Sequence, residues 1–246
     1  MRGNPVAKGI LFTAGGAICW GFSGTCAQLL MDVYGVPLAW NVCVRLVFAS
    51  LLYLGFCLAT RREALVRLLK RPRELALHFV FAIFGVLLVQ VCYQGCISVT
   101  NAGTATVFER CGLIIIMFIT CIQARRAPKG RELLGVALAI VGTICIATKG
   151  NVGSLAIPPI ALLWGAGSAC SLVFYTMMPV RMLDRWGSVV TTTVSMSMAA
   201  IVANAVVQPW NMDVEVTPGI VAAMAALVIV GTFIAYLMFL QGVKLA

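Results

Sequence analysis

The stretch LAWNVCVRLVFASLLYLGFCLA, residues 38–59, decides the fold class, because it is long and apolar and holds one charged side chain, Arg45. A helix that crosses the hydrocarbon core of a bilayer needs about 20 residues of this kind. Segments of similar length and character recur along the chain at 9–31, 38–59, 77–99, 103–122, 132–148, 157–178, 188–208 and 218–243. The sequence therefore predicts an all-α, polytopic membrane bundle with eight spanning helices.

The composition excludes a water-soluble fold. The chain is 61% hydrophobic and 11% charged, against roughly 45–50% apolar and about 25% charged residues in a soluble domain. The net charge of +10 is spread between apolar segments, so it does not indicate a nucleic-acid partner. All ten cysteines fall inside apolar segments, where we expect small buried side chains rather than a disulfide framework.

The basic residues alternate from one side of the predicted membrane to the other. Of the 18 Lys and Arg, 15 lie before the first segment or after an even-numbered one, and six of these fall within residues 60–76. The opposite loops hold Lys149 with three acidic residues. Because Lys and Arg accumulate on the cytoplasmic side, we expect a cytoplasmic N-terminus in a multi-pass protein of the inner membrane. Residues 60–76 are expected to lie along the membrane surface, facing lipid headgroups.

An internal repeat relates the two parts of the chain. The matches are CWGFS (19–23) with LWGAGS (163–168), Tyr34-Gly35 with Trp186-Gly187, and Gln94-Gly95 with Gln241-Gly242. They occur in the same order, offset by 144, 152 and 147 residues. Five spans precede the second unit, an odd number, so that unit enters the membrane inverted. The sequence predicts a first repeat of five helices in residues 1–152 and a second, incomplete repeat of three in residues 153–246. Inverted repeats are a recurrent architecture of secondary transporters.

Four short motifs add to this pattern: WGFS at 20–23, the stretch from Pro37 to Leu52, TNAGTA at 100–105 and LLGVALAIVG at 133–142. Together they resemble the ten-helix exporters of the drug/metabolite transporter superfamily, EamA type. The resemblance implies an exporter of small metabolites, amino-acid-like solutes or drugs that works by alternating access and needs no cofactor. It leaves open a homodimer and a proton as the coupling ion.

The sequence departs from that family in three places. Cys111-Gly112 replaces the usual Ser-Pro pair, so the helix-distorting proline is absent, and Ala124-Arg125-Arg126 replaces Gly-Glu-Arg. The ninth and tenth helices of the family have no counterpart before Ala246. An alternative is therefore a non-transporting fragment, or half of a transporter that another chain completes.

A membrane-embedded enzyme is a further alternative. The sequence contains no Walker loop, no His-Cys cluster with metal-ligand spacing and no Gly-x-Ser-x-Gly motif, which are the patterns that would favour nucleotide, metal or acyl-transfer chemistry. We therefore predict no enzymatic activity and no metal site.

Three charged residues, Arg45, Glu109 and Arg110, fall well inside spans, where charges are costly and usually face protein or water. Counting from the outer ends of their helices, Arg45 and Glu109 both lie about 10 Å deep. The sequence predicts that they form an ion pair, either a switchable pair or a static structural bridge. Glu109 is also the candidate carrier of a coupling proton.

Polar and aromatic side chains within the spans are the candidate substrate-binding residues. They are Trp20 in the first span, Gln90, Tyr93 and Gln94 in the third, Trp164, Ser168 and Tyr175 in the sixth, and Tyr236 in the eighth. Gln90 and Gln94 are one helical turn apart, and Trp20 and Trp164 occupy equivalent places in the repeat. The alternative for each of them is helix packing or hydrogen bonding between helices.

Overall fold

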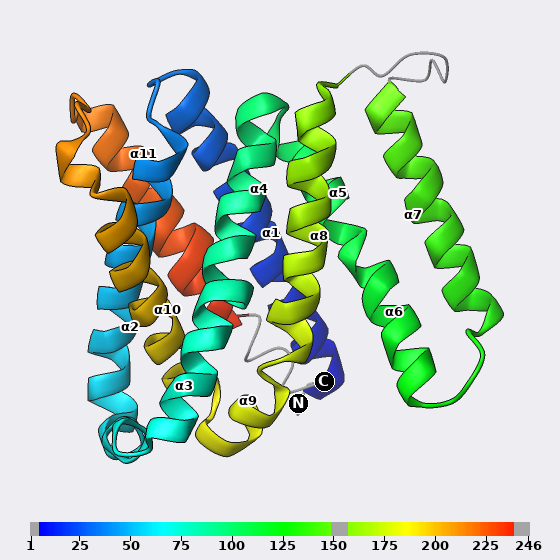
Figure 1. Ribbon diagram of the computed structural model, residues 1–246, viewed down its shortest axis with the longest axis horizontal. Helices are drawn as coiled ribbons and strands as arrows, with labels where there is room; N and C mark the ends of the chain where they lie inside the picture. The colour runs from blue at the N-terminus through cyan, green and yellow to red at the C-terminus, as the bar shows by residue number, and fades with distance from the viewer. Residues whose placement is uncertain (1–4, 149–156, 239–246) are drawn as a thin grey trace.

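The computed structural model describes residues 5–148 and 157–238, and every regular element in them is a helix (Figure 1). In chain order these are α1 (Pro5–Asp32), α2 (Leu38–Leu69), α3 (Pro72–Val80), η1 (Phe81–Leu87), α4 (Leu88–Val99), α5 (Ala102–Arg110), α6 (Gly112–Gln123), α7 (Gly130–Thr148), α8 (Pro159–Met177), α9 (Val180–Trp186), α10 (Ser188–Val207), η2 (Pro209–Asn211), α11 (Pro218–Val228) and η3 (Ile229–Ile234). Elements η1 and η3 are π-helices, and η2 is one 3-10 turn. The predicted all-α class is confirmed.

Within the described residues, seven helical stretches are long and apolar enough to cross a membrane. They are Gly9–Asp32, Leu38–Leu69, Pro72–Val99, Ala102–Gln123, Pro159–Trp186, Ser188–Asn211 and Pro218–Met238. The remaining predicted segment, 132–148, is also helical, as α7, although it is not among these seven. The predicted repeat boundary at residues 152 and 153 and the Gln241-Gly242 match lie outside the described residues.

Helix α2 continues to Leu69, about three turns beyond the predicted end of its span at residue 59. The backbone leaves helical geometry at Arg61, with φ −140° and ψ 27°, and Figure 1 shows the turns after this kink almost end-on at the foot of the bundle. Leu65 and Leu68 are buried there against Val190 and Val194 of α10, while the cations around them are exposed. The kink thus lays a short amphipathic helix across the end of the bundle.

The fourth span is interrupted although it lacks the family's proline. Cys111 separates α5 from α6, and its thiol lies 3.2 Å from the hydroxyl of Thr143 on α7. Gly112 lies against α8, where an added Cβ would come within 2.5 Å of the carbonyl oxygen of Ala169. A glycine therefore permits the close approach at this break. Glu109 and Arg110 are the last two residues of α5.

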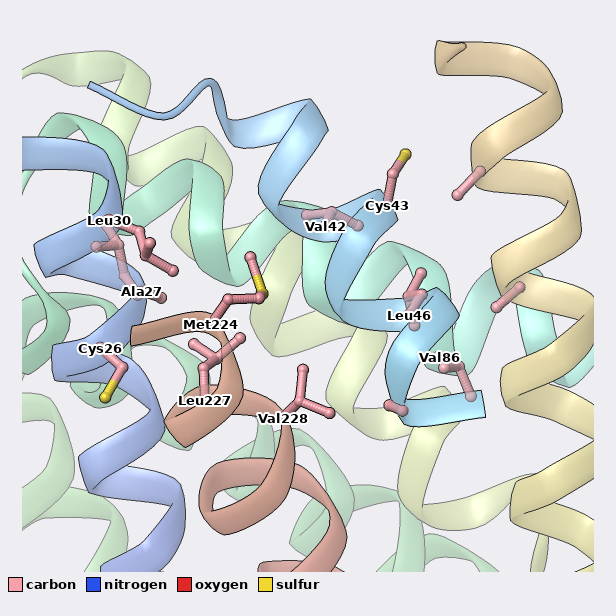
Figure 2. Packing of buried hydrophobic residues seen from close by; sticks show 14 of the residues in the cluster. Cys26, Ala27, Leu30, Val42, Cys43, Leu46, Val86, Met224, Leu227 and Val228 are labelled. Carbon is pink, nitrogen blue, oxygen red and sulfur yellow. The ribbon is translucent and has the colours of Figure 1, made fainter. Parts of the chain in front are cut away.

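The helices of the two halves, residues 5–148 and 157–238, pack across each other. Helix α2 lies along α10, α1 packs against α11 and η3, and α8 packs against η1 and α4. Figure 2 shows Met224, Leu227 and Val228 of α11 between side chains of α1 and α2. Helices α6 and α7 lie at one edge of the bundle (Figure 1). The main core therefore joins the two halves.

Candidate functional site

A cavity of about 160 Å³ lies between the halves. Its walls are Ala17, Trp20, Gly21 and Ser23 of α1, Arg45 of α2, Val89, Gln90 and Tyr93 of α4, Thr106, Glu109 and Arg110 of α5, Leu172 and Tyr175 of α8, and Tyr236 of the span Pro218–Met238. Eight residues that the sequence singled out meet here, namely Trp20, Arg45, Gln90, Tyr93, Glu109, Arg110, Tyr175 and Tyr236. The structure thus brings most of the candidate residues to one place.

Arg45 reaches the cavity from α2 with 5% of its surface exposed. Its Nε donates a hydrogen bond of 3.2 Å to Oγ1 of Thr232 in η3, and its Nη2 donates one of 3.0 Å to Oγ of Ser23 in α1. Both acceptors are neutral hydroxyls. The cation is therefore held by hydrogen bonds, and no carboxylate of the described residues lies within 4.0 Å of it.

The predicted ion pair between Arg45 and Glu109 is not formed. Both residues line the cavity, but within residues 5–148 and 157–238 the ion pairs within 4.0 Å are Arg126 with Glu132 and Arg185 with Glu74. Arg45 and Glu109 were predicted to lie at the same depth from their positions along the helices. Those positions could not show that two hydroxyls hold the guanidinium in another direction.

Glu109 and Arg110 end the helix half that precedes the break at Cys111. The Glu109 side chain is partly buried, whereas Arg110 is exposed and reaches the cavity at its edge. A partly buried carboxylate at a cavity wall can accept a hydrogen bond, pair with an ammonium group or take up a proton.

Aromatic rings form one side of the cavity. The rings of Trp20 and Tyr236 meet edge to face, with centroids 5.3 Å apart, and those of Tyr175 and Tyr236 lie 6.4 Å apart. The Tyr93 hydroxyl shares a 3.0 Å hydrogen bond with Thr106. These side chains supply apolar surface together with hydroxyl groups, a combination typical of small-molecule sites.

Three predicted residues lie away from the cavity lining. Gln94 is fully buried and accepts a 2.9 Å hydrogen bond from Asn41 of α2. Trp164 packs on Gly95, where an added Cβ would lie 2.6 Å from its indole. Ser168 is fully buried, and its hydroxyl has no hydrogen-bond partner among the described residues. Because four residues of an α-helix turn through about 400°, Gln90 can face the cavity while Gln94 turns toward α2.

Sequence reasoning missed the hydroxyl groups that surround the charged residues. Ser23 and Thr106 line the cavity. Thr232 is outside the cavity lining and accepts a hydrogen bond from Arg45. Ser and Thr are common in membrane helices as links between helices, so their presence alone gives little signal. Ser23 was nevertheless part of the repeated WGFS motif, which could have pointed to it.

Comparison with known proteins identifies the family. The model of the EamA-like transporter family matches residues 7–148, more than half of the chain. The chain belongs to the EamA-like transporter family. This EamA-like transporter is also 29% identical over 238 residues to the protein named "Uncharacterized inner membrane transporter YicL" of Salmonella typhimurium strain LT2. That alignment covers 97% of the chain and 79% of the relative, and no solved structure matches.

The family assignment agrees with the fold. The chain is a membrane transporter and a multi-pass protein of the inner membrane, as the sequence predicted; its described residues include seven helices of membrane-spanning length. The family match covers the first half, and the alignment to the YicL transporter extends over both halves.

Proposed function

We propose that this transporter exports small, amino-acid-like solutes through the cavity by alternating access. The observation that supports this most directly is that one cavity inside the membrane offers a buried cation, Arg45, and a carboxylate, Glu109, and that neither forms an ion pair within 4.0 Å with any described residue. A zwitterion can satisfy both, with its carboxylate on the guanidinium and its ammonium group on Glu109. The aromatic wall accepts an apolar side chain.

The packing of the helices supports alternating access between inverted repeats. In each half the first helix packs against the third span of the other half, α1 against α11 and η3, and α8 against η1 and α4. The two π-helices begin at Phe81 and Ile229, which are 148 residues apart and therefore agree with the repeat offsets of 144 to 152. Two related halves around a central cavity can exchange shapes and open it to either side.

Counterflow in proteoliposomes tests substrate binding. Proteoliposomes that contain the purified chain are loaded with each of the twenty amino acids in turn. Entry of the radiolabelled amino acid in exchange for the unlabelled one is then measured. Arg45→Gln removes the charge partner of the carboxylate, which in a desolvated site costs about 2–5 kcal/mol, so exchange of accepted amino acids should fall by more than about 30-fold. Arg62→Gln, at an exposed cation, is the matched control. Exchange that survives unchanged in Arg45→Gln would contradict the site.

Inverted membrane vesicles test direction and coupling. With an acidic lumen, a proton antiporter should accumulate substrate inside. Glu109→Gln should weaken counterflow, because the ammonium group loses its carboxylate partner, but it should abolish accumulation even at substrate concentrations that restore counterflow. The other titratable or charged side chains that line the cavity are Arg45, Arg110, Tyr93, Tyr175 and Tyr236, and Glu109 is the carboxylate among them. Gradient-driven accumulation that persists in Glu109→Gln would exclude Glu109 as the proton carrier, and Glu63→Gln, at an exposed position of α2 after the kink, is the control.

A further inference from the structure

The π-helix η3 gives Thr232 an unusual pair of hydrogen bonds. Its hydroxyl donates to the carbonyl oxygen of Leu227, five residues earlier, at 3.1 Å, and accepts from Nε of Arg45 at 3.2 Å. A threonine in a regular α-helix bonds the carbonyl three or four residues earlier, whereas the wider π-turn brings the fifth into reach. Thr232 is 1% exposed. Its hydroxyl therefore has a fixed direction, set by its own backbone.

Helix α1 completes the support from the other side. Gly231, next to Thr232, lies so close to α1 that an added Cβ would come within 2.5 Å of Cβ of Ser23. Ser23 in turn accepts from Nη2 of Arg45 at 3.0 Å. Two edges of the guanidinium are thus held by hydroxyls from both halves, and Nη1 makes no hydrogen bond to any described residue. Since Arg45 lines the cavity, its remaining donors are available there.

We propose that Thr232 is a positioning residue that holds the guanidinium of Arg45 with its free donors toward the cavity and thereby sets the affinity for carboxylate-bearing solutes. The proposal rests on the proposed function in taking Arg45 as the carboxylate partner. A neutral hydroxyl suits this task because it fixes the geometry without cancelling the charge, as a carboxylate partner would. Thr232 itself acts through Arg45 and is outside the cavity lining.

The first test needs no substrate. The purified protein is treated with 2,3-butanedione in borate, which modifies guanidinium groups, and modification of Arg45 is followed by mass spectrometry of its peptide. Thr232→Val keeps the shape and removes the hydroxyl, so the freed guanidinium should react at least about threefold faster, and Thr232→Ser should restore the native rate. Thr120→Val is the matched control, because the exposed Thr120 also bonds a carbonyl of its own helix. An unchanged rate in Thr232→Val overturns the proposal.

The second test measures affinity by counterflow of leucine, a zwitterion with an apolar side chain. Thr232→Val should raise the half-saturating concentration about tenfold with little change in maximal rate, since one hydrogen bond to a charged group is lost, and Thr232→Ser should return it to the native value. A lower maximal rate at unchanged half-saturation would indicate a merely structural role and overturn the proposal. If the native chain fails to exchange any amino acid, the proposed function fails, whereas the butanedione result still decides whether Thr232 positions Arg45.

Folding is controlled with a second variant. Ser23→Ala removes the other hydroxyl bound to Arg45 and leaves η3 intact. If Thr232→Val does not give a monodisperse protein, Ser23→Ala should still show faster modification of Arg45 than Thr120→Val. Equal rates in these two variants would show that the hydroxyls do not hold the guanidinium.

Discussion

At each end of the bundle an aromatic residue followed by a glycine contacts the first turn of a helix, but the two contacts differ in chemistry. At the end that carries residues 61–73, which we call the basic end, Trp186 at the close of α9 contacts Glu74 in the first turn of α3. At the opposite end, Tyr34 lies against Gly219 in the first turn of α11. Each of these contacts joins the first half to the second, so each must change if the halves move.

The shared geometry comes from glycine and proline. Gly35 and Gly187 follow Tyr34 and Trp186 with φ of +64° and +77°, a conformation that side chains other than glycine rarely adopt. The helices that are touched, α3 and α11, each have proline at their first position, where its missing N–H costs nothing. At both ends, therefore, a glycine with positive φ follows the aromatic residue, and that residue contacts the first turn of a helix from the other half.

The chemistry separates them. At the basic end, Arg185 pairs with Glu74, Nε1 of Trp186 donates to the same carboxylate at 3.2 Å, and the guanidinium groups of Arg71 and Arg185 lie 5.6 Å from the centre of the indole. At the opposite end the contact is one of shape, between a ring and a residue without a side chain. The basic end should therefore resist opening more strongly than the opposite end, and its contacts should weaken in salt.

The largest effect is expected for Glu74→Ala. It leaves Arg185 and the indole N–H without their acceptor, and together these are worth about 2 kcal/mol after discounting for the exposure of Arg185. Amide hydrogen exchange in α9 should then rise about 30-fold. Glu63→Ala, at an exposed acid nearby, should leave α9 unchanged. If hydrogen exchange in α9 stays at the native level in Glu74→Ala, the contacts of Glu74 with Arg185 and Trp186 do not hold the basic end closed.

Trp186→Phe should have a smaller effect, because it removes the donor and keeps a ring beneath Arg71 and Arg185. The loss of one hydrogen bond to a carboxylate at a half-exposed site is about 1 kcal/mol, or roughly a fivefold rise in exchange in α9. If the effect is as large as that of Glu74→Ala, the indole contact alone stabilises the basic end, and the ion pair of Arg185 with Glu74 adds nothing.

Gly219→Ala tests the contact of shape at the opposite end. The new methyl group would collide with the ring of Tyr34, which is 39% exposed and can move aside, while alanine improves helix propensity by about 1 kcal/mol. The thermal unfolding midpoint should therefore change little. In a Tyr34→Ala background the collision is gone, and the same substitution should stabilise the protein. Equal effects in both backgrounds would show that Tyr34 does not contact α11 in solution.

The spans could be predicted from the sequence because hydropathy alone limits where a chain can cross a bilayer. Their details could not. The two turns of α2 after Arg61 are amphipathic and lie outside the apolar segment, so no hydropathy signal included them in the helix. The π-turns at Phe81 and Ile229, on which α8 and α1 pack, leave no mark in composition.

The cavity could be predicted in part for a related reason. Depth in the membrane follows from counting along a helix, and this placed Arg45 and Glu109 at one level, where the structure brings both to the cavity. The direction in which each side chain points depends on how the helix is rotated against its neighbours. For that reason Gln94 binds Asn41 rather than facing the cavity. The contact between the hydroxyl of Thr232 and Arg45 could not be predicted from residue spacing either.

The smallest effect is expected for Tyr34→Phe, which is the counterpart of Trp186→Phe at the other end. Tyr34→Phe removes only the phenolic hydroxyl, whereas Trp186→Phe removes the indole N–H and replaces two fused rings by one; both lose the polar tip of the side chain. At the basic end that tip binds a carboxylate, whereas Tyr34 meets a glycine, so hydrogen exchange in α11 should change by less than about twofold. Measuring both variants in low and high salt separates the two kinds of closure, because only the variant at the basic end should lose its difference from the native protein as salt screens the charges. A salt-dependent rise in exchange in α11 of Tyr34→Phe would mean that the hydroxyl takes part in a polar closure of its own, and the two ends would then be alike in chemistry as well as in shape.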